Sequence, residues 1–156
     1  MAAQENAQQT LEDNKAVVRR WFEEVLNHED FQVFDNICAV CHPQMLLTGG
    51  GGLGDIPGME GAKQQIRVLR KAFPDIVFKV EEQIAEGNSV VTRISARATH
   101  AGEFQGVPPT GKQVNISGVS IWTVGEGQLI QEQVIVDRLA MLEQLGLLAA
   151  PGQGAA

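Results

Sequence analysis

Apolar residues recur at helical spacing in three segments of the first half of the chain. From Asp13 or Asn14 to Leu26, apolar side chains fall on one face and charged side chains on the other, which predicts an amphipathic helix. Its apolar face consists of Val17, Val18, Trp21, Phe22, Val25 and Leu26. A shorter helix is predicted from Phe31 to Cys38, and another from about Glu60 to Ala72, before the helix-breaking Pro74.

The second half of the chain alternates between apolar and polar residues, which predicts strands. Four strands are expected, at Ile76–Ala85, Ser89–Ala101, Lys112–Val124 and Gln128–Val136. The turn sequences Glu86-Gly87-Asn88 and Gly125-Glu126-Gly127 join them into two hairpins. A last short helix is expected at about Arg138–Leu145, with Asp137 as its N-cap and Gly146 at its C-terminal end.

This order of elements, helices first and strands afterwards, is typical of an α+β domain. The chain has 156 residues, which fits one domain better than two. We expect that domain to span residues 13–148. Residues 1–12 are polar and Gln-rich, and residues 149–156 are rich in Ala, Gly and Gln, so both ends are predicted to be mobile.

Strand parity places one carboxylate on an apolar face of the predicted sheet. Alternate side chains of a strand point to opposite faces, so Glu132 shares a row with Ile130, Val134 and Val136. The matching rows of the two preceding strands bring Ser120, Trp122 and His100 to the same face. A few polar groups in an apolar hollow are typical of a small-molecule site. Burial would raise the pKa of the carboxyl of Glu132, which suits general acid or base chemistry.

Each of these residues also has a purely structural interpretation. Glu132 could be a strand-edge residue that reaches solvent or pairs with Arg97, and His100 could be solvated near the end of its strand. Trp122 fits a pocket wall better than a chemical role. His42 and Thr48, in the glycine-rich connection, could reach the mouth of the cavity.

Composition argues against several classes of function. The formal net charge is -7, and no basic stripe is present, so nucleic acid is not an expected partner. No apolar run approaches the roughly 20 residues that span a bilayer, so no membrane association is expected. The N-terminus does not resemble a signal peptide, and two cysteines do not make a disulfide framework, so we expect a cytoplasmic protein.

Two short motifs are interpreted as coincidental. Cys38-Ala39-Val40-Cys41-His42 has the spacing of a c-type haem attachment site, but such attachment needs export, and no fourth ligand for a metal is evident. A free buried cysteine is the ordinary alternative. The glycine run at residues 49–54 lacks the Lys-Ser/Thr ending of a phosphate-binding loop and indicates a flexible loop instead.

Four stretches of the chain resemble the SnoaL-like polyketide cyclase and ester cyclase family, within the nuclear transport factor two-like superfamily. They are Asn14–Phe22, Phe73-Pro74-Asp75, Thr99–Lys112 and Leu142–Gly146. The resemblance implies a cone, in which a curved antiparallel sheet wraps around helices and encloses a pocket, often in a homodimer or higher homo-oligomer. It also implies cyclisation by intramolecular aldol chemistry, with no metal and no organic cofactor.

The residues that the family uses for this chemistry are largely replaced here. Its last-strand histidine and acidic base align with Glu132 and Val134, and its polar pair on the preceding strand aligns with Gly118 and Ser120. Its early-loop asparagine aligns near Leu47. Glu132 is therefore the remaining candidate base. The candidate catalytic residues are Glu132 and His100, and the candidate substrate-binding residues are Ser120, Trp122, Val134, Gly118, Leu47 and Trp21.

Three functions follow as hypotheses. The first is an enzyme that transfers a proton to or from a hydrophobic, polyketide- or terpenoid-like substrate, of cyclase or isomerase type. The second is a non-catalytic binding protein for a hydrophobic small molecule, favoured by the apolar replacements at Leu47, Gly118 and Val134. The third is an epoxide hydrolase, although Arg97 and Asp137 lie on the opposite parity from Glu132.

Overall fold

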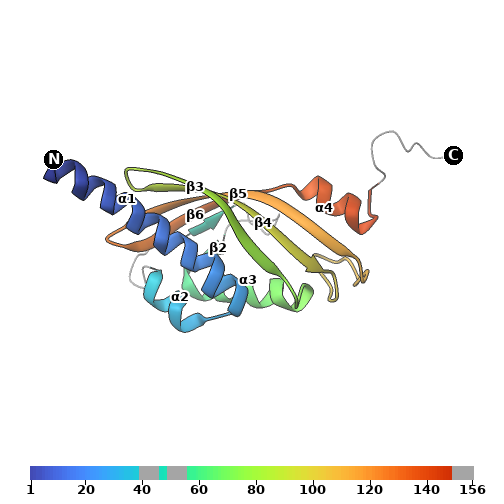
Figure 1. The fold of residues 1–156 in the computed structure, drawn as a ribbon. Helices are drawn as coiled ribbons and strands as arrows, with labels where there is room; N and C mark the ends of the chain where they lie inside the picture. Colours follow the sequence, from blue (N-terminus) through green and yellow to red (C-terminus); the bar gives the residue numbers. More distant parts are fainter. Residues whose placement is uncertain (39–45, 49–55, 149–156) are drawn as a thin grey trace.

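A computed structural model describes residues 1–38, 46–48 and 56–148 of the chain. It has the predicted α+β architecture: a curved sheet with helices packed on its concave side (Figure 1). The helices are α1 (Ala2–Arg20), the π-helix η1 (Trp21–Leu26), α2 (Phe31–Ile37), α3 (Gly58–Ala72) and α4 (Arg138–Leu145). The strands are β1 (Leu46–Thr48), β2 (Ile56–Pro57), β3 (Val77–Glu86), β4 (Ser89–Thr99), β5 (Gln113–Gly125) and β6 (Gln128–Val136).

The described strands form one six-stranded sheet in the order β2-β1-β6-β5-β4-β3. The four long strands pair antiparallel through two hairpins, as predicted, whereas the short β1 pairs parallel to β6. Two register shifts, at Val80/Glu82 in β3 and at Thr123/Val124 in β5, mark bulges. Bulges bend a strand and increase its twist, which helps this sheet to curl around the helices.

The first helical segment ends at Leu26 as predicted, but its start and the pitch of its last turns differ from the prediction. It begins at Ala2 rather than near Asp13, and residues 3–10 are helical but exposed. At its other end the chain widens into η1, whose buried side chains are Trp21, Phe22, Val25 and Leu26. π-helical turns are rare and are frequently found at functional sites. Periodicity predicted the apolar face but could not show the change in helical pitch.

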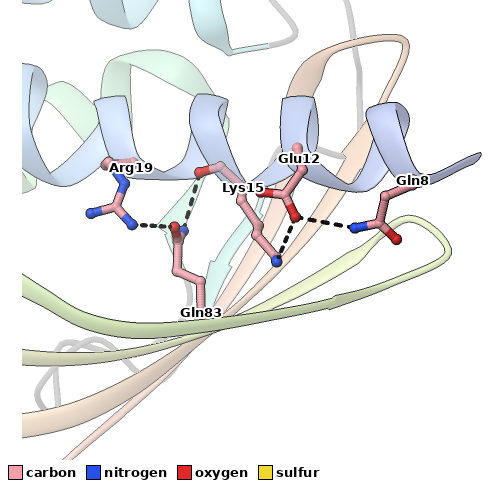
Figure 2. Close-up of polar contacts among 5 residues, drawn as sticks. All are labelled: Gln8, Glu12, Lys15, Arg19 and Gln83. Atoms are coloured by element: carbon pink, nitrogen blue, oxygen red, sulfur yellow. Dashed lines mark hydrogen bonds and ion pairs between the residues drawn. The ribbon is translucent and has the colours of Figure 1, made fainter. Parts of the chain in front are cut away.

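The amide of Gln83 on β3 attaches α1 to the sheet (Figure 2). Its Nε2 donates to the carbonyl of Lys15 at 3.1 Å, and its Oε1 accepts from Arg19 at 3.0 Å. The same Nε2 also lies 3.3 Å from Oγ1 of the buried Thr92. Lys15 further pairs with Glu12 at 3.0 Å, an exposed contact of the kind that contributes little to stability.

The remaining predicted elements are confirmed closely. Helices α2 and α3 lie within two residues of their predicted bounds, and β6 and α4 match theirs. Asp137 caps α4 by accepting from the backbone N–H of Ala140 at 3.0 Å, and Gly146 ends that helix in the left-handed conformation, with φ of 78°. The strands β1 and β2 were not predicted, because pairs and triplets of residues carry no periodicity.

One strand row departs from simple alternation. Strict alternation along β6 puts Leu129 on the outer face, opposite to Glu132, but Leu129 is fully buried. The bulge opposite Val124 inserts one residue before Gln131, so the inward parity changes between Leu129 and Glu132. The predicted inward face of β4 is confirmed, because Val90, Thr92, Ile94, Ala96 and Ala98 are all buried.

Candidate functional site

A cavity of about 160 Å³ lies between the concave face of the sheet and the helices. Its described walls come from η1, α3, the four long strands and α4. An engineered apolar cavity of about 150 Å³ accepts benzene, so this volume suits a compact ligand of one or two rings. The lining is almost wholly apolar, and Glu132 is the single ionisable residue among the described residues that line it.

Glu132 reaches this cavity because β6 is held on both sides. It faces Trp122 across the antiparallel pairing with β5, and Leu47 across the parallel pairing with β1. Its side chain is only 5% exposed, so it is neither the solvated edge residue nor the partner of Arg97 that an alternative interpretation allowed. Arg97 is exposed on the other face of the sheet.

Burial raises the pKa of Glu132 from 4.5 to about 7. The hydroxyl of Ser120 opposes this rise by donating to Oε1 of Glu132 at 2.7 Å. The indole N–H of Trp122 favours the ionised form more weakly, from outside ordinary hydrogen-bond geometry. A carboxyl with a pKa near neutrality can both accept and return a proton, as a general acid–base catalyst must.

We expect Ser120→Ala to raise the pKa of Glu132 by roughly one unit, because a hydrogen bond to a charged group is worth about 1.5 kcal/mol. Titration of the carboxyl carbon by NMR, with ¹³C-labelled glutamate, would measure the midpoint. Ser117→Ala is the matched control, since Ser117 lies on the same strand but is exposed. An unchanged midpoint in Ser120→Ala would contradict the assigned hydrogen bond.

Polar contacts to Asn27, the residue after η1, fix part of the cavity wall. Its amide clamps the backbone of Phe78, donating to the carbonyl at 2.9 Å and accepting from the N–H at 2.7 Å. Arg70 of α3 donates to the carbonyls of Asn27 at 2.6 Å and Ile76 at 2.9 Å. These bonds join η1, α3 and β3, and thereby hold Phe78 and Ile76 in the cavity wall.

Three predicted site residues on β5 lie behind the cavity wall rather than in it. Ser120 and Trp122 are fully buried, and neither lines the cavity. Trp122 packs edge-on against Trp21, with ring centroids 5.2 Å apart. Gly118 lies where β5 and β6 approach closely, since a Cβ there would meet the carbonyl oxygen of Ile135 at 2.7 Å. Ser120 holds the carboxyl of Glu132 by a hydrogen bond, whereas Trp122 and Gly118 contribute to the packing of the sheet.

The other predicted substrate-binding residues are placed differently. Val134 and Trp21 do line the cavity, Trp21 from η1 and Val134 from β6. Leu47 lies in β1 beside Glu132 by backbone pairing, and its side chain is outside the described residues. His42, Cys41 and the glycine run at 49–54 also fall outside them, as does the tail at 149–156.

His100 does not line the cavity, so we leave it out of the proposed chemistry. It is fully buried, in contrast to the solvated strand-end histidine that was the alternative. The backbone N–H of Thr110 donates to Nδ1 of His100 at 3.3 Å, and Oγ1 of Thr110 lies 3.1 Å from the same nitrogen. The ring packs on Phe73, with centroids 5.3 Å apart. His100 thus fastens the connection between β4 and β5.

The remaining candidates have structural roles. Cys38 is a free, buried thiol whose pKa is raised by burial to about 12, so it is unreactive. Among the described residues, no three His, Cys, Asp or Glu side chains gather to hold a metal. With Asp137 capping α4 and Arg97 exposed on the outer face, these two residues do not form a water-activating set for epoxide hydrolysis.

Sequence reasoning missed Gln65, Phe104 and Met141, which also line the cavity. A signal for Gln65 was present, because it falls between Ala62 and Leu69 on the apolar face of α3. Phe104 comes from the loop between β4 and β5, where no periodicity applies. Its ring packs edge-on against Phe73, with centroids 5.2 Å apart.

Comparison with known proteins agrees with this geometry. The family model for SnoaL-like polyketide cyclase matches residues 16–145. The chain belongs to the SnoaL-like polyketide cyclase family. This assignment and the curved-sheet fold confirm the resemblance seen in the sequence, and they give the chain the fold of small-molecule cyclases and isomerases.

Solved structures of other proteins share this fold. A protein from Jannaschia sp. CCS1, assigned as a SnoaL-like polyketide cyclase, is 26% identical with a TM-score of 0.75, over 89% of this chain and 94% of that one. IdmH from Streptomyces antibioticus, assigned as a polyketide cyclase, is 29% identical with a TM-score of 0.70, over 85% and 98%. AclR from Streptomyces galilaeus, assigned as a hydroxylase, is 24% identical with a TM-score of 0.75, over 92% and 87%, and shows the fold alone. No curated protein matches the sequence.

Proposed function

We propose that this SnoaL-like protein is a cofactor-free acid–base enzyme of cyclase or isomerase type, with Glu132 as its proton-transfer group. The observation that supports this most is the placement of Glu132 as the one ionisable side chain among the described lining residues, with a pKa of about 7. At neutral pH a large fraction of the protein would hold the carboxylate in an apolar wall. Such a carboxylate can remove a proton from a carbon next to a carbonyl.

The cavity also restricts the substrate. A nearly apolar lining and a small volume favour a compact, neutral, hydrophobic molecule, such as a small polyketide- or terpenoid-like compound. The overall charge of -7 and the carboxylate itself disfavour an anion. The direct test is the effect of Glu132→Gln on proton abstraction, which is argued in the Discussion.

A second candidate function is binding of a hydrophobic small molecule without turnover. It is favoured by Val134, an apolar cavity residue at the position where the family resemblance places the acidic base. Native mass spectrometry of the purified protein would detect a retained apolar ligand. A bound ligand together with inactive wild-type protein would favour this second function over the first.

We further propose that two copies associate through the outer face of the sheet. Apolar side chains meet there across strands: Ile84 opposes Val91, Val91 opposes Ile121, and Val119 opposes Ile135. Ile84 is 62% exposed and Ile135 is 61% exposed, and an exposed apolar patch is typical of an interaction site.

We expect Ile135→Glu to convert a dimer into a monomer, because each copy would bury an unpaired carboxylate in the interface. Light scattering coupled to size-exclusion chromatography measures the mass directly. Gln64→Glu, on the exposed face of α3, is the charge-matched control. A monomeric wild type, or an unaffected dimer in the variant, would contradict the proposed interface.

Within the described residues, no helix has the length and apolar character needed to cross a membrane. A cytoplasmic location remains an expectation from the sequence.

A further inference from the structure

The strands give the cavity two distinct ends. Glu132 on β6 pairs with Trp122 on β5, whereas the cavity-lining Ile116 lies six residues further along β5. A strand advances about 3.3 Å per residue, so these two levels of the sheet are roughly 20 Å apart. Glu132 therefore lies at one end of the lined face of the sheet, and Ile116 lies at the other.

Helix α3 runs between the same two ends (Figure 1). It begins directly after β2, where Ile56 is joined through β1 to Glu132 at the same level of the sheet. At its other end, the carbonyl of Ala72 accepts the N–H groups of Ala101 and Gly102, which follow β4, at 3.0 Å each. The helix has 15 residues, and at 1.5 Å per residue it spans about 22 Å, in agreement with the strands.

The end of the cavity away from Glu132 is closed by apolar side chains. Phe73, Ile76, Phe104 and Met141 line it and belong to one packed cluster, against which Ile116 also packs. Each of the four is at most 6% exposed, so a ligand has no path to solvent between them. These large side chains also occupy part of the length between the two ends, which leaves the cavity short.

Phe104 is held in this wall by its own turn. Its backbone N–H donates to the carbonyl of Val107 at 3.0 Å, and the N–H of Val107 donates back at 2.9 Å. The two residues between them, Gln105 and Gly106, have positive φ, as a tight two-residue turn requires. Arg138 of α4 donates to Oε1 of Gln105 at 2.6 Å. The turn is thus fixed, and its side chains can vary without altering a helix or a long strand.

The geometry assigns Phe104 as the end stop of the cavity, the residue that limits how far the apolar tail of a substrate can extend away from Glu132. This inference rests on the proposed function and deepens it, because it describes the substrate: a neutral carbonyl compound with its reactive carbon near Glu132 and a short apolar tail toward Phe104. Among the described residues, no ionisable side chain lines the closed end. A polar tail would lose its water there without gaining a partner.

Alkyl phenyl ketones can measure the usable length of the cavity. The series from acetophenone to octanophenone keeps the phenyl ring and the carbonyl, and it lengthens the alkyl chain by one carbon at a time. Calorimetry gives the affinity of each member. For the wild type we expect binding to strengthen about fourfold per added carbon until the ligand meets Phe104, and then to stop strengthening or to weaken.

Phe104→Ala should move this break to a chain about three carbons longer, because the deleted ring leaves space at the closed end. Phe104→Trp should move it to a shorter chain, a change that general loosening of the fold would not cause. Val107→Ala is the matched control, because Val107 lies on the same turn, is half-buried and does not line the cavity. Unchanged binding of acetophenone shows that the pocket of each variant is intact. Phe104→Leu should give a smaller lengthening, and it keeps the test open if Phe104→Ala fails to fold.

The same break in the wild type and in the folded Phe104 variants would overturn the end stop, and so would a steady gain along the whole series in the wild type. Neither result bears on Glu132, whose role is measured by proton abstraction. Conversely, Glu132→Gln should keep the wild-type break, because the amide has the shape of the acid. The end stop can therefore stand even if Glu132 fails as a base. If the wild type binds no member of the series, both the end stop and the proposed substrate class are wrong.

Discussion

Glu132→Gln should lower the rate of proton abstraction by roughly 10²–10⁴-fold, the usual contribution of a well-placed general base. The amide keeps the shape of the side chain and can still bond to Ser120, but it cannot take a proton. A practical substrate is 5-nitrobenzisoxazole, a compact two-ring compound whose ring opens when a base removes its one carbon-bound ring proton beside nitrogen. The coloured phenolate product is followed by absorbance.

Controls make this experiment specific to Glu132. Glu126→Gln changes an exposed glutamate at the tip of the same hairpin and should keep the wild-type rate. The wild-type rate should rise with pH to a plateau, with a midpoint near the pKa of about 7, because only the ionised carboxyl acts as a base. Equal rates in Glu132→Gln and wild type would rule out Glu132 as the base.

A second substrate tests the cyclase assignment itself. Heptane-2,6-dione closes by intramolecular aldol addition and loses water to give 3-methylcyclohex-2-enone. Activity on 5-nitrobenzisoxazole without ring closure of the dione would leave a general base in an apolar pocket, and would argue against cyclisation of this kind.

Glu132→Gln should also change how stability depends on pH. The folded-state pKa of about 7 lies above the unfolded value near 4.5, so the folded protein binds this proton more tightly. The wild type therefore keeps its full stability below about pH 4.5 and loses this contribution as the pH rises to about 7. The loss at higher pH is on the order of 3 kcal/mol.

Urea unfolding at about pH 5 and pH 8 would measure this linkage. The difference in unfolding free energy between Glu132→Gln and wild type should shift in favour of the variant by on the order of 3 kcal/mol between the two pH values. Glu126→Gln should show no such shift. A constant difference between Glu132→Gln and wild type would mean that the carboxyl is better solvated than its burial indicates.

Most of the fold could be predicted from the sequence, because long amphipathic segments have a clear period. The bounds of β6 and α4, the caps at Asp137 and Gly146, and the buried row of β4 all follow from alternation or from turn chemistry. Strand parity also placed Glu132 and its partner Ser120 on the inner face. The features that were not predicted are local ones, namely the start of α1, the π-helical turn at Trp21, and the two short strands.

The candidate site was harder to predict than the fold, because one buried face contains both cavity and packed core. Ser120, Trp122 and His100 share the inward parity of Glu132, yet all three are fully buried and none lines the cavity. Trp122 is packed against Trp21 of η1, and His100 is packed against Phe73. Whether an inward residue touches a cavity depends on which helix lies above it. That choice depends on tertiary packing, which the alternation of polar and apolar residues along a single strand does not reveal. Gln65 is different, because its place on the apolar face of α3 was a signal present in the sequence but not used.

The bulge between β5 and β6 has a consequence for how this protein can vary. It absorbs one residue between the hairpin tip at Glu126 and the cavity-facing part of β6. On the side of the bulge away from the hairpin tip, Trp122 pairs with Glu132, and this register turns the carboxyl toward the cavity. The length of the loop at the tip therefore need not affect the direction of the Glu132 side chain. We expect insertions at the tip to be tolerated without moving Glu132 out of its cavity.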